Sequence, residues 1–142
     1  MQIDELVLSS DLLTTNTDEP VLALSKILAD NNIGALPVCD ADGGLVGIIS
    51  ERDIVRGVAK YAGAVEKLTV ADLMTGDVIS CAPGDDVTDI LAVMGEKKIR
   101  HLPVIDAGRL TAIVSFRDVM AAVLERTCQE RTNMTMAYEM VR

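Results

Sequence analysis

The chain contains two copies of one sequence unit, and this internal repeat limits its possible folds more than any other feature. The segment Ile33–Asp53 aligns with Ile99–Asp118 when one gap is placed opposite Asp42. More than half of the aligned positions are identical, including a Leu-Pro-Val triplet, an Asp-Ala pair and a Ser-x-Arg-Asp end. Self-similarity of this extent indicates that one supersecondary unit is built twice.

Each copy predicts the order strand, helix, strand, strand, helix, so the expected fold class is α/β. Apolar residues at helical spacing precede each Leu-Pro-Val, and a turn rich in Asp and Gly follows it, which predicts a helix and then an antiparallel hairpin. A second helix is expected to start at Ser50 and at Ser115. The expected strands are Leu12–Thr15, Ala35–Cys39 and Leu45–Ile49 in the first copy, and Val78–Cys81, Leu102–Ile105 and Leu110–Val114 in the second.

These elements divide the chain into a first repeat over residues 1–66, a second over 67–126 and a C-terminal helical tail over 127–142. Between the copies, Lys60–Thr69 is expected to form a short linker. Thr69 is expected to cap a brief helix over Val70–Met74.

The tail has an apolar stripe of its own. Met134, Tyr138 and Val141 recur at helical spacing. Such a stripe needs a partner surface, and methionine adapts to imperfect ones. We therefore expect the tail to pack across a homodimer.

Composition excludes several kinds of partner. Asp and Glu outnumber Lys and Arg by 22 to 13, and the net charge of −9 repels polyanions. With 2% aromatic residues there is no platform for stacking bases, so no nucleic-acid partner is expected. No apolar run approaches the ~18 residues that a membrane span requires, and the N-terminus is acidic. These features predict a cytoplasmic protein without membrane contact.

The residues that build most catalytic and metal sites are sparse. His101 is the single histidine, and the cysteines at 39, 81 and 128 are far apart with no C-x-x-C pair. One histidine supports neither a histidine-based metal site nor a versatile catalytic triad. We therefore expect no metal, no catalytic cofactor and no enzymatic activity.

The Ser-x-x-Asp pattern occurs at the predicted start of a helix in both copies, as Ser50 with Asp53 and as Ser115 with Asp118. A serine three positions before an acidic residue resembles a capping box, which local physics alone would justify. The same geometry also suits a ligand, because free backbone N–H groups attract an anion and a carboxylate accepts ribose hydroxyls. Both copies also contain an arginine beside the aspartate, Arg52 and Arg117, which a cap does not need.

The segment before each Leu-Pro-Val differs between the copies. The first copy has Gly34 and Ala35 there, whereas the second has Arg100 and His101, which are separated from Lys97–Lys98 by one residue. This local excess of positive charge suggests an anion site in an otherwise acidic protein. A solvated helix C-terminus explains the same charges, because cations are favourable there.

Taken together, the repeated unit resembles a CBS (cystathionine beta-synthase) domain, and the chain is similar to a tandem pair of them over residues 5–125. The resemblance rests on Leu-Pro-Val followed by the Ser-x-Arg-Asp end in both copies, and on the Val70–Thr75 segment that resembles the entry to a second repeat. It implies a pseudo-twofold module with two clefts between the repeats. It also implies a homodimer that binds AMP, ADP, ATP, NAD or S-adenosylmethionine and regulates a separate, unknown partner protein.

The resemblance also implies ligand-contacting residues. One cleft would combine Ser50, Arg52 and Asp53 with Arg100 and His101. The other would combine Ser115 and Asp118 with Gly34 and Ala35. Pro37 and Pro103 would lie beside them. In this family the Ser-x-x-Asp of one repeat holds the ribose, while the segment before Leu-Pro-Val of the other approaches the phosphates.

One departure from the family pattern affects the expected affinities. Ala112 stands where the family has glycine, as at Gly47 in the first copy, and its methyl group would crowd the cleft that contains Asp118. That cleft also lacks an opposing cation in this interpretation, so we expect the Asp53 cleft to bind more tightly. The alternatives are a structural dimerisation module whose clefts stay empty and a module specific for S-adenosylmethionine.

Overall fold

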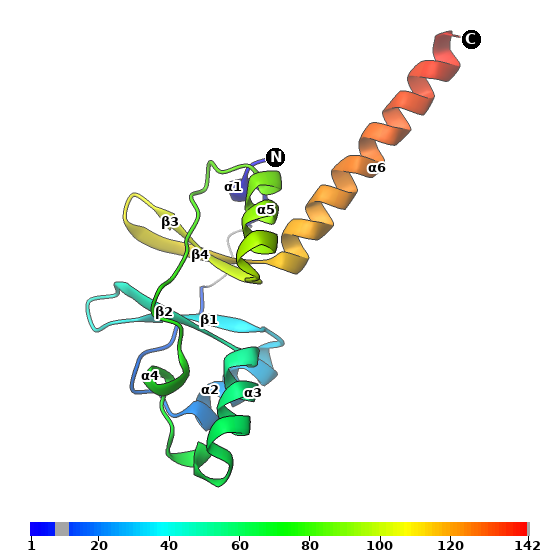
Figure 1. The fold of residues 1–142 in the computed structure, drawn as a ribbon. Coiled ribbons are helices and arrows are strands. Elements are labelled where there is room, and N and C mark those ends of the chain that lie inside the picture. Colours follow the sequence, from blue (N-terminus) through cyan, green and yellow to red (C-terminus); the bar gives the residue numbers. More distant parts are fainter. Residues whose placement is uncertain (8–11, 142) are drawn as a thin grey trace.

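The computed structural model describes residues 1–7 and 12–141, and in it two similar halves face each other through their β-hairpins (Figure 1). Each half has one two-stranded antiparallel sheet with helices packed around it. This arrangement confirms the predicted α/β class and the C-terminal helix. The helices are α1 (Ile3–Leu6), α2 (Val21–Asn31), α3 (Glu51–Tyr61), the 3-10 helix η1 (Ala62–Lys67), α4 (Val70–Leu73), α5 (Val87–Lys97) and α6 (Phe116–Val141), and the strands are β1 (Ala35–Cys39), β2 (Leu45–Ser50), β3 (His101–Asp106) and β4 (Arg109–Ser115).

The two hairpins form as predicted because their turns have the right residues. In the first, the Asp40 carboxylate accepts hydrogen bonds from the backbone N–H groups of Asp42 and Gly44 at 3.0 and 2.8 Å. In the second, Ala107 and Gly108 both have positive φ, 49° and 79°, between paired strand ends. Positive φ at both central residues matches the right-handed twist of a two-residue hairpin.

The opening strand predicted in each copy is reduced to one residue. Thr15 forms an isolated parallel bridge with β1, and Cys81 forms the equivalent bridge with β3. Their N–H groups donate to the carbonyls of Pro37 and Pro103 at 3.0 and 2.9 Å. A longer ladder would need N–H donors from these prolines, which proline lacks. The predicted strands over 12–15 and 78–81 are therefore wrong in extent.

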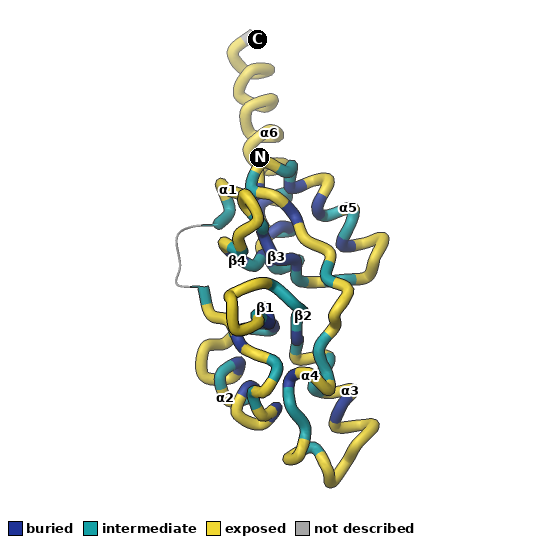
Figure 2. Tube along the Cα trace, turned by 90° about the vertical axis from the view of Figure 1, so that its left-hand side faces the viewer, coloured by how far each residue is buried: buried dark blue, intermediate teal, exposed yellow. Residues whose placement is uncertain are grey.

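The hydrophobic cores do not follow the order of the chain. Ile3 of α1 is fully buried in the core of the second half, and Val70 of α4 is fully buried in the core of the first. Equivalent backbone bonds hold the two short helices: Ile3 N–H donates to the Asp85 carbonyl, and Val70 N–H to the Glu19 carbonyl, both at 2.9 Å. Each half is thus completed by a segment that lies outside its own repeat, as Figures 1 and 2 show.

The expected linker between the repeats and the C-terminal tail are both largely helical. The expected linker over 60–69 consists of the end of α3 and the helix η1, followed by Thr69, which caps α4 as predicted. Helix α6 continues without a break from the second repeat into the tail, which confirms that the tail is helical. Its C-terminal part projects away from both halves (Figure 1), and Met134 and Met140 are 75% and 87% exposed.

Candidate functional site

Helix α3 starts at a complete capping box. The Ser50 backbone N–H and Oγ donate to Asp53 Oδ2 at 2.9 and 3.1 Å, and Ser50 Oγ accepts from the Asp53 N–H at 3.3 Å. Thr69 and Asp72 form an equivalent box at the start of α4. The capping interpretation of Ser-x-x-Asp is therefore confirmed in the first copy, where the Asp53 carboxylate is engaged by its own helix start.

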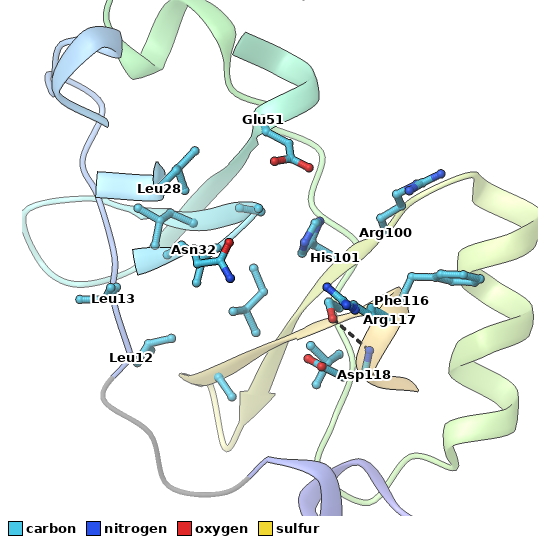
Figure 3. A pocket seen from close by; sticks show the side chains of 18 of the residues that line it. Leu12, Leu13, Leu28, Asn32, Glu51, Arg100, His101, Phe116, Arg117 and Asp118 are labelled. Carbon is cyan, nitrogen blue, oxygen red and sulfur yellow. Dashed lines mark hydrogen bonds between the residues drawn. The ribbon is translucent and has the colours of Figure 1, made fainter. Parts of the chain in front are cut away.

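Helix α6 starts differently. The Asp118 N–H donates to Ser115 Oγ at 3.1 Å, drawn as the dashed line in Figure 3. Within the described residues, no hydrogen bond to the Asp118 carboxylate is present, and Asp118 is exposed. The same sequence pattern thus leaves one of its two carboxylates available for another donor.

Backbone hydrogen bonds join each helix start to the segment before its own hairpin. The Glu51 N–H donates to the Gly34 carbonyl at 2.9 Å, and the Phe116 N–H donates to the Arg100 carbonyl at 2.6 Å. The segments that the sequence analysis singled out are therefore fixed beside the N-terminal ends of α3 and α6. Such ends have unpaired N–H groups and positive partial charge.

The larger of two clefts between the halves, here the Asp118 cleft, has a volume of about 1130 Å³. Ser115 at the end of β4 and Arg117 and Asp118 at the start of α6 line it, and Gly34 and Ala35 line it from the other half. Figure 3 shows it between Leu12, Leu13 and Leu28 on one side and the start of α6 on the other. Its wall is apolar at Leu12, Leu13, Leu28, Ile33, Ile54, Val55, Ile113 and Phe116.

The smaller cleft, here the Asp53 cleft, has a volume of about 210 Å³. Ser50, Arg52 and Asp53 line it from the first half, and Arg100 and His101 from the second. Ligand sites generally span about 300–1,000 Å³, so the volume of the Asp53 cleft lies below this range and that of the Asp118 cleft slightly above it. The other lining residues of the Asp53 cleft are Ile48, Glu51, Arg56, Thr75, Asp77, Val78, Ile79, Lys98 and Ile99.

The structure brings together the residues that the sequence analysis grouped, but one of its expectations about the Asp118 cleft is wrong. Arg100 lines this cleft too, together with His101, so the cleft does have a cation from the segment before Leu-Pro-Val. Ala112 lines the Asp118 cleft, which is nevertheless the larger of the two. Pro37 and Pro103 line neither cleft; they lie within β1 and β3.

Gly47 and Ala112 differ for a packing reason. A Cβ on Gly47 would lie 2.8 Å from Met74 Sδ and 2.9 Å from the Thr75 carbonyl oxygen. Thr75 is bonded through its backbone to Ile48, so a methyl group has no room there. In the second half, Ala112 is buried and its methyl group fits within the core.

His101 lies between two carboxylates and next to Arg100. Figure 3 places its imidazole between Glu51 of α3 and Asp118 of α6. Burial lowers the pKa of His101, the carboxylates of Glu51 and Asp118 raise that pKa, and Arg100 lowers it further. Burial has the largest effect, so the pKa lies below its ordinary value of 6.5. The neutral imidazole is therefore favoured, and a nearby anion would favour the charged form.

The sequence analysis missed several lining residues. Glu51 lines both clefts, although the motif was defined by the residues around it. Leu13 and Ile79 line one cleft each and are 41% and 39% exposed. These two apolar residues stand at equivalent positions of the two copies, and both are exposed to solvent. That equivalence was visible in the repeat and marks an exposed apolar surface in each cleft.

The pattern of the CBS domain matches residues 3–60 and 70–125. The chain belongs to the CBS domain family. In sequence, this CBS pair is 34% identical over 115 residues to the protein YlbB of Bacillus subtilis, which covers 80% of this chain and 76% of YlbB. It is 35% identical over 98 residues to a 33.4 kDa protein of Thermofilum pendens, of which it spans 32%, and 39% identical over 104 residues to a 17.7 kDa protein of Acidianus ambivalens, of which it spans 60%.

Solved structures share the fold of this CBS pair. The CBS-domain containing protein ATU1752 from Agrobacterium tumefaciens superimposes with a TM-score of 0.82 at 32% identity, over 86% of this chain and 98% of that one. The CBS domain pair of protein MJ0100, in complex with 5′-methylthioadenosine and S-adenosyl-L-methionine, superimposes with a TM-score of 0.80 at 28% identity, over 89% and 98% of the chains. A CBS pair of similar fold thus binds adenosyl compounds.

Residues 1–7 and 12–141 contain no helix that is both long and apolar enough to span a membrane. The same part of the chain contains no group of three or more His, Cys, Asp or Glu residues placed to hold a metal ion.

Proposed function

We propose that this CBS pair is a non-catalytic regulatory module that binds an adenosine phosphate, AMP, ADP, ATP or NAD, first in the Asp118 cleft. The proposal rests on three features that meet in this cleft: an apolar wall, the carboxylate of Asp118, and the basic side chains of Arg100, His101 and Arg117. An adenosine phosphate has the matching parts in one molecule: a flat apolar base, two ribose hydroxyls and an anionic end. The protein regulated would be a separate partner, in the cytoplasm, and the module would act as a homodimer.

Each part of such a ligand has a suitable partner. The base packs against the apolar residues around Leu13, and the Asp118 carboxylate accepts hydrogen bonds from the ribose hydroxyls. The phosphate lies near Arg117 and the N-terminal end of α6, where backbone N–H groups and the helix dipole favour an anion. This order of preference reverses the sequence-based ranking of the two clefts, because the Asp53 carboxylate already serves its own helix.

S-adenosylmethionine is the second candidate. It is supported by the MJ0100 pair, whose structure contains S-adenosyl-L-methionine and 5′-methylthioadenosine. Its sulfonium and ammonium charges are positive, and the Asp118 cleft also has two carboxylates, Glu51 and Asp118. A purely structural dimerisation module with empty clefts is the remaining alternative, and a binding experiment separates it from both.

The proposal is tested by a thermal-shift screen followed by calorimetry on the full chain. AMP, ADP, ATP, NAD, S-adenosylmethionine and free adenine are compared, because a ligand at 100 times its Kd stabilises the folded state by about 2.7 kcal/mol. We expect adenosine phosphates to bind more tightly than adenine. Absence of any shift or heat with all five adenosyl compounds would refute the proposal and favour the structural module.

A matched pair of variants locates the site. Asp118→Ala should weaken AMP binding about 10- to 100-fold, since hydrogen bonds with charged groups contribute about 1.5–3 kcal/mol. Asp72→Ala removes a similar carboxylate from a Ser/Thr-x-x-Asp helix start that lines neither cleft. It should lower the melting temperature and leave the Kd for AMP unchanged. Equal losses of affinity in both variants would place the binding site elsewhere.

A further inference from the structure

The two clefts have part of their wall in common. Glu51, Arg100 and His101 line both the Asp118 cleft and the Asp53 cleft. All three lie where the start of α3 meets the start of β3. The carboxylates of the two Ser-x-x-Asp motifs are not shared, because Asp118 lines only the first cleft and Asp53 only the second.

The sharing follows from the difference between the repeats. Arg100 and His101 stand at the positions that Gly34 and Ala35 occupy in the first copy. A symmetric pair would place one basic dipeptide at each cleft, whereas this chain has one for both. The glycine leaves the space that the imidazole fills: a Cβ on Gly34 would lie 3.2 Å from His101 Nε2.

An imidazole has two nitrogen atoms and a guanidinium one fixed fork, so neither can turn its full set of donors toward two ligands in different places. A phosphate in one cleft that orients Arg100 and His101 withdraws them from the other. Two phosphates on either side of this wall also repel each other, and partly buried charges are screened less than exposed ones. Both effects weaken the binding of a phosphate in one cleft when the other cleft is filled.

We propose that Glu51, Arg100 and His101 couple the two clefts negatively, so that an adenosine phosphate in one cleft weakens the binding of a second in the other. This inference rests on the proposed function, because it requires anionic ligands. Coupling between sites on one protein generally amounts to about 5- to 150-fold in affinity, and it is reciprocal. We expect a factor of about 5 or more here, because the wall is shared directly rather than through intervening residues.

The experiment is calorimetry with AMP on the full chain, and the quantity compared is the Kd of the Asp53 cleft with the other cleft filled or empty. In the unmodified protein, the second binding step reports the Asp53 cleft beside an occupied neighbour. In Asp118→Ala the same cleft binds beside an empty one, and its Kd should be about 5-fold or more lower. Asp118→Asn keeps the side-chain shape and serves if the alanine variant is unstable.

Two further variants assign the coupling to the shared wall. His101→Gln and Arg100→Ala, each combined with Asp118→Ala, should bring the ratio of the two Kd values toward one. Arg56 lines only the Asp53 cleft, so Arg56→Ala should weaken that cleft and leave the ratio unchanged. A stoichiometry of one AMP per chain in the unmodified protein would also support the inference if the Asp53 cleft binds AMP in Asp118→Ala. That result would correspond to strong negative coupling.

Other results would overturn it. Equal Kd values for the Asp53 cleft with its neighbour filled or empty, tighter binding beside a filled neighbour, or a ratio that persists in both wall variants would each refute the coupling. So would one AMP in the unmodified protein and none in Asp118→Ala, a result that leaves the proposed function intact. No binding of AMP, ADP, ATP or NAD at all would instead refute the proposed function, and the coupling with it.

Discussion

The imidazole of His101 occupies the space that Gly34 leaves open, since a Cβ on Gly34 would lie 3.2 Å from Nε2 and 3.3 Å from Cε1. The two residues come from different repeats and from neighbouring positions of the aligned unit. Their contact shows how a difference between two similar sequences becomes a structural feature. A side chain in one copy is accommodated by the absence of a side chain in the other.

Gly34→Ala is therefore expected to press the imidazole toward the cleft and to weaken AMP binding. Gly34 has no positive φ, so alanine introduces no backbone strain and only the contact with His101 counts. Because the ring borders an open cleft and can shift, the loss of unfolding free energy should lie near the low end of the ~1–3 kcal/mol typical of overpacking. Urea unfolding and calorimetry with AMP measure the two effects.

The control for this prediction is a double-mutant cycle. In a His101→Ala background, Gly34→Ala should cost little, and the interaction free energy of the cycle should reach about 0.5 kcal/mol or more. An identical cost of Gly34→Ala with and without the imidazole would contradict the packing argument.

The titration of His101 makes stability depend on pH in a defined direction. Burial holds the pKa of the folded protein's imidazole below 6.5, so the unfolded chain binds more protons just below that pH. The unfolding free energy should therefore fall as the pH drops from 6.5 through the folded-state pKa of His101. Well above pH 6.5, His101 should not contribute to the pH dependence of the unfolding free energy. Denaturant unfolding across this range measures the slope. In His101→Gln the slope in this window should be smaller; an unchanged slope would assign it to other groups.

Gly47 is expected to tolerate no side chain. Gly47→Ala should lower the unfolding free energy by about 1–3 kcal/mol, because its Cβ would meet Met74 and the backbone of Thr75. Gly95 in α5 is the matched control, since nothing lies within 4 Å of its added Cβ. Gly95→Ala should stabilise the protein by about 0.5–1 kcal/mol through helix propensity. A neutral Gly47→Ala in urea unfolding would mean that α4 shifts without cost.

The projecting part of α6 is expected to pack across a homodimer. Met134, Met136, Tyr138 and Met140 are 59–87% exposed in the single chain, and exposed apolar patches mark interaction surfaces. The charges around Cys128 also suit an antiparallel pair of α6 helices. In a pairing centred on Cys128, Glu125 and Arg126 of one chain meet Arg131 and Glu130 of the other, as an isologous contact requires.

Truncation after Arg126 should therefore raise the dimer dissociation constant in sedimentation equilibrium. The melting temperature of the monomeric unit should change little, since neither core cluster includes a residue beyond 126. A dimer constant that survives truncation would show that the tail has another role.

Much of the fold was predictable because its signals are local. The hairpin turn at Ala107–Gly108 and the capping boxes at Ser50 and Thr69 depend on residues within a few positions of one another. The resemblance to the CBS domain implied which segments would share a cleft. The shortened opening strands were missed because the limit is set by Pro37 and Pro103, on the partner strands more than 20 residues away.

By itself, the sequence determined that this protein consists of two α/β units with a helical tail, since periodicity, turn residues and caps act over short distances. Only the tertiary structure decided that α1 completes the second unit and α4 the first, and that both clefts meet at His101. The two units have nearly equivalent cores, so local pattern does not distinguish which of them buries Ile3 or Val70. That choice depends on burial and backbone bonds between segments far apart in the chain, which form only when the whole molecule is assembled.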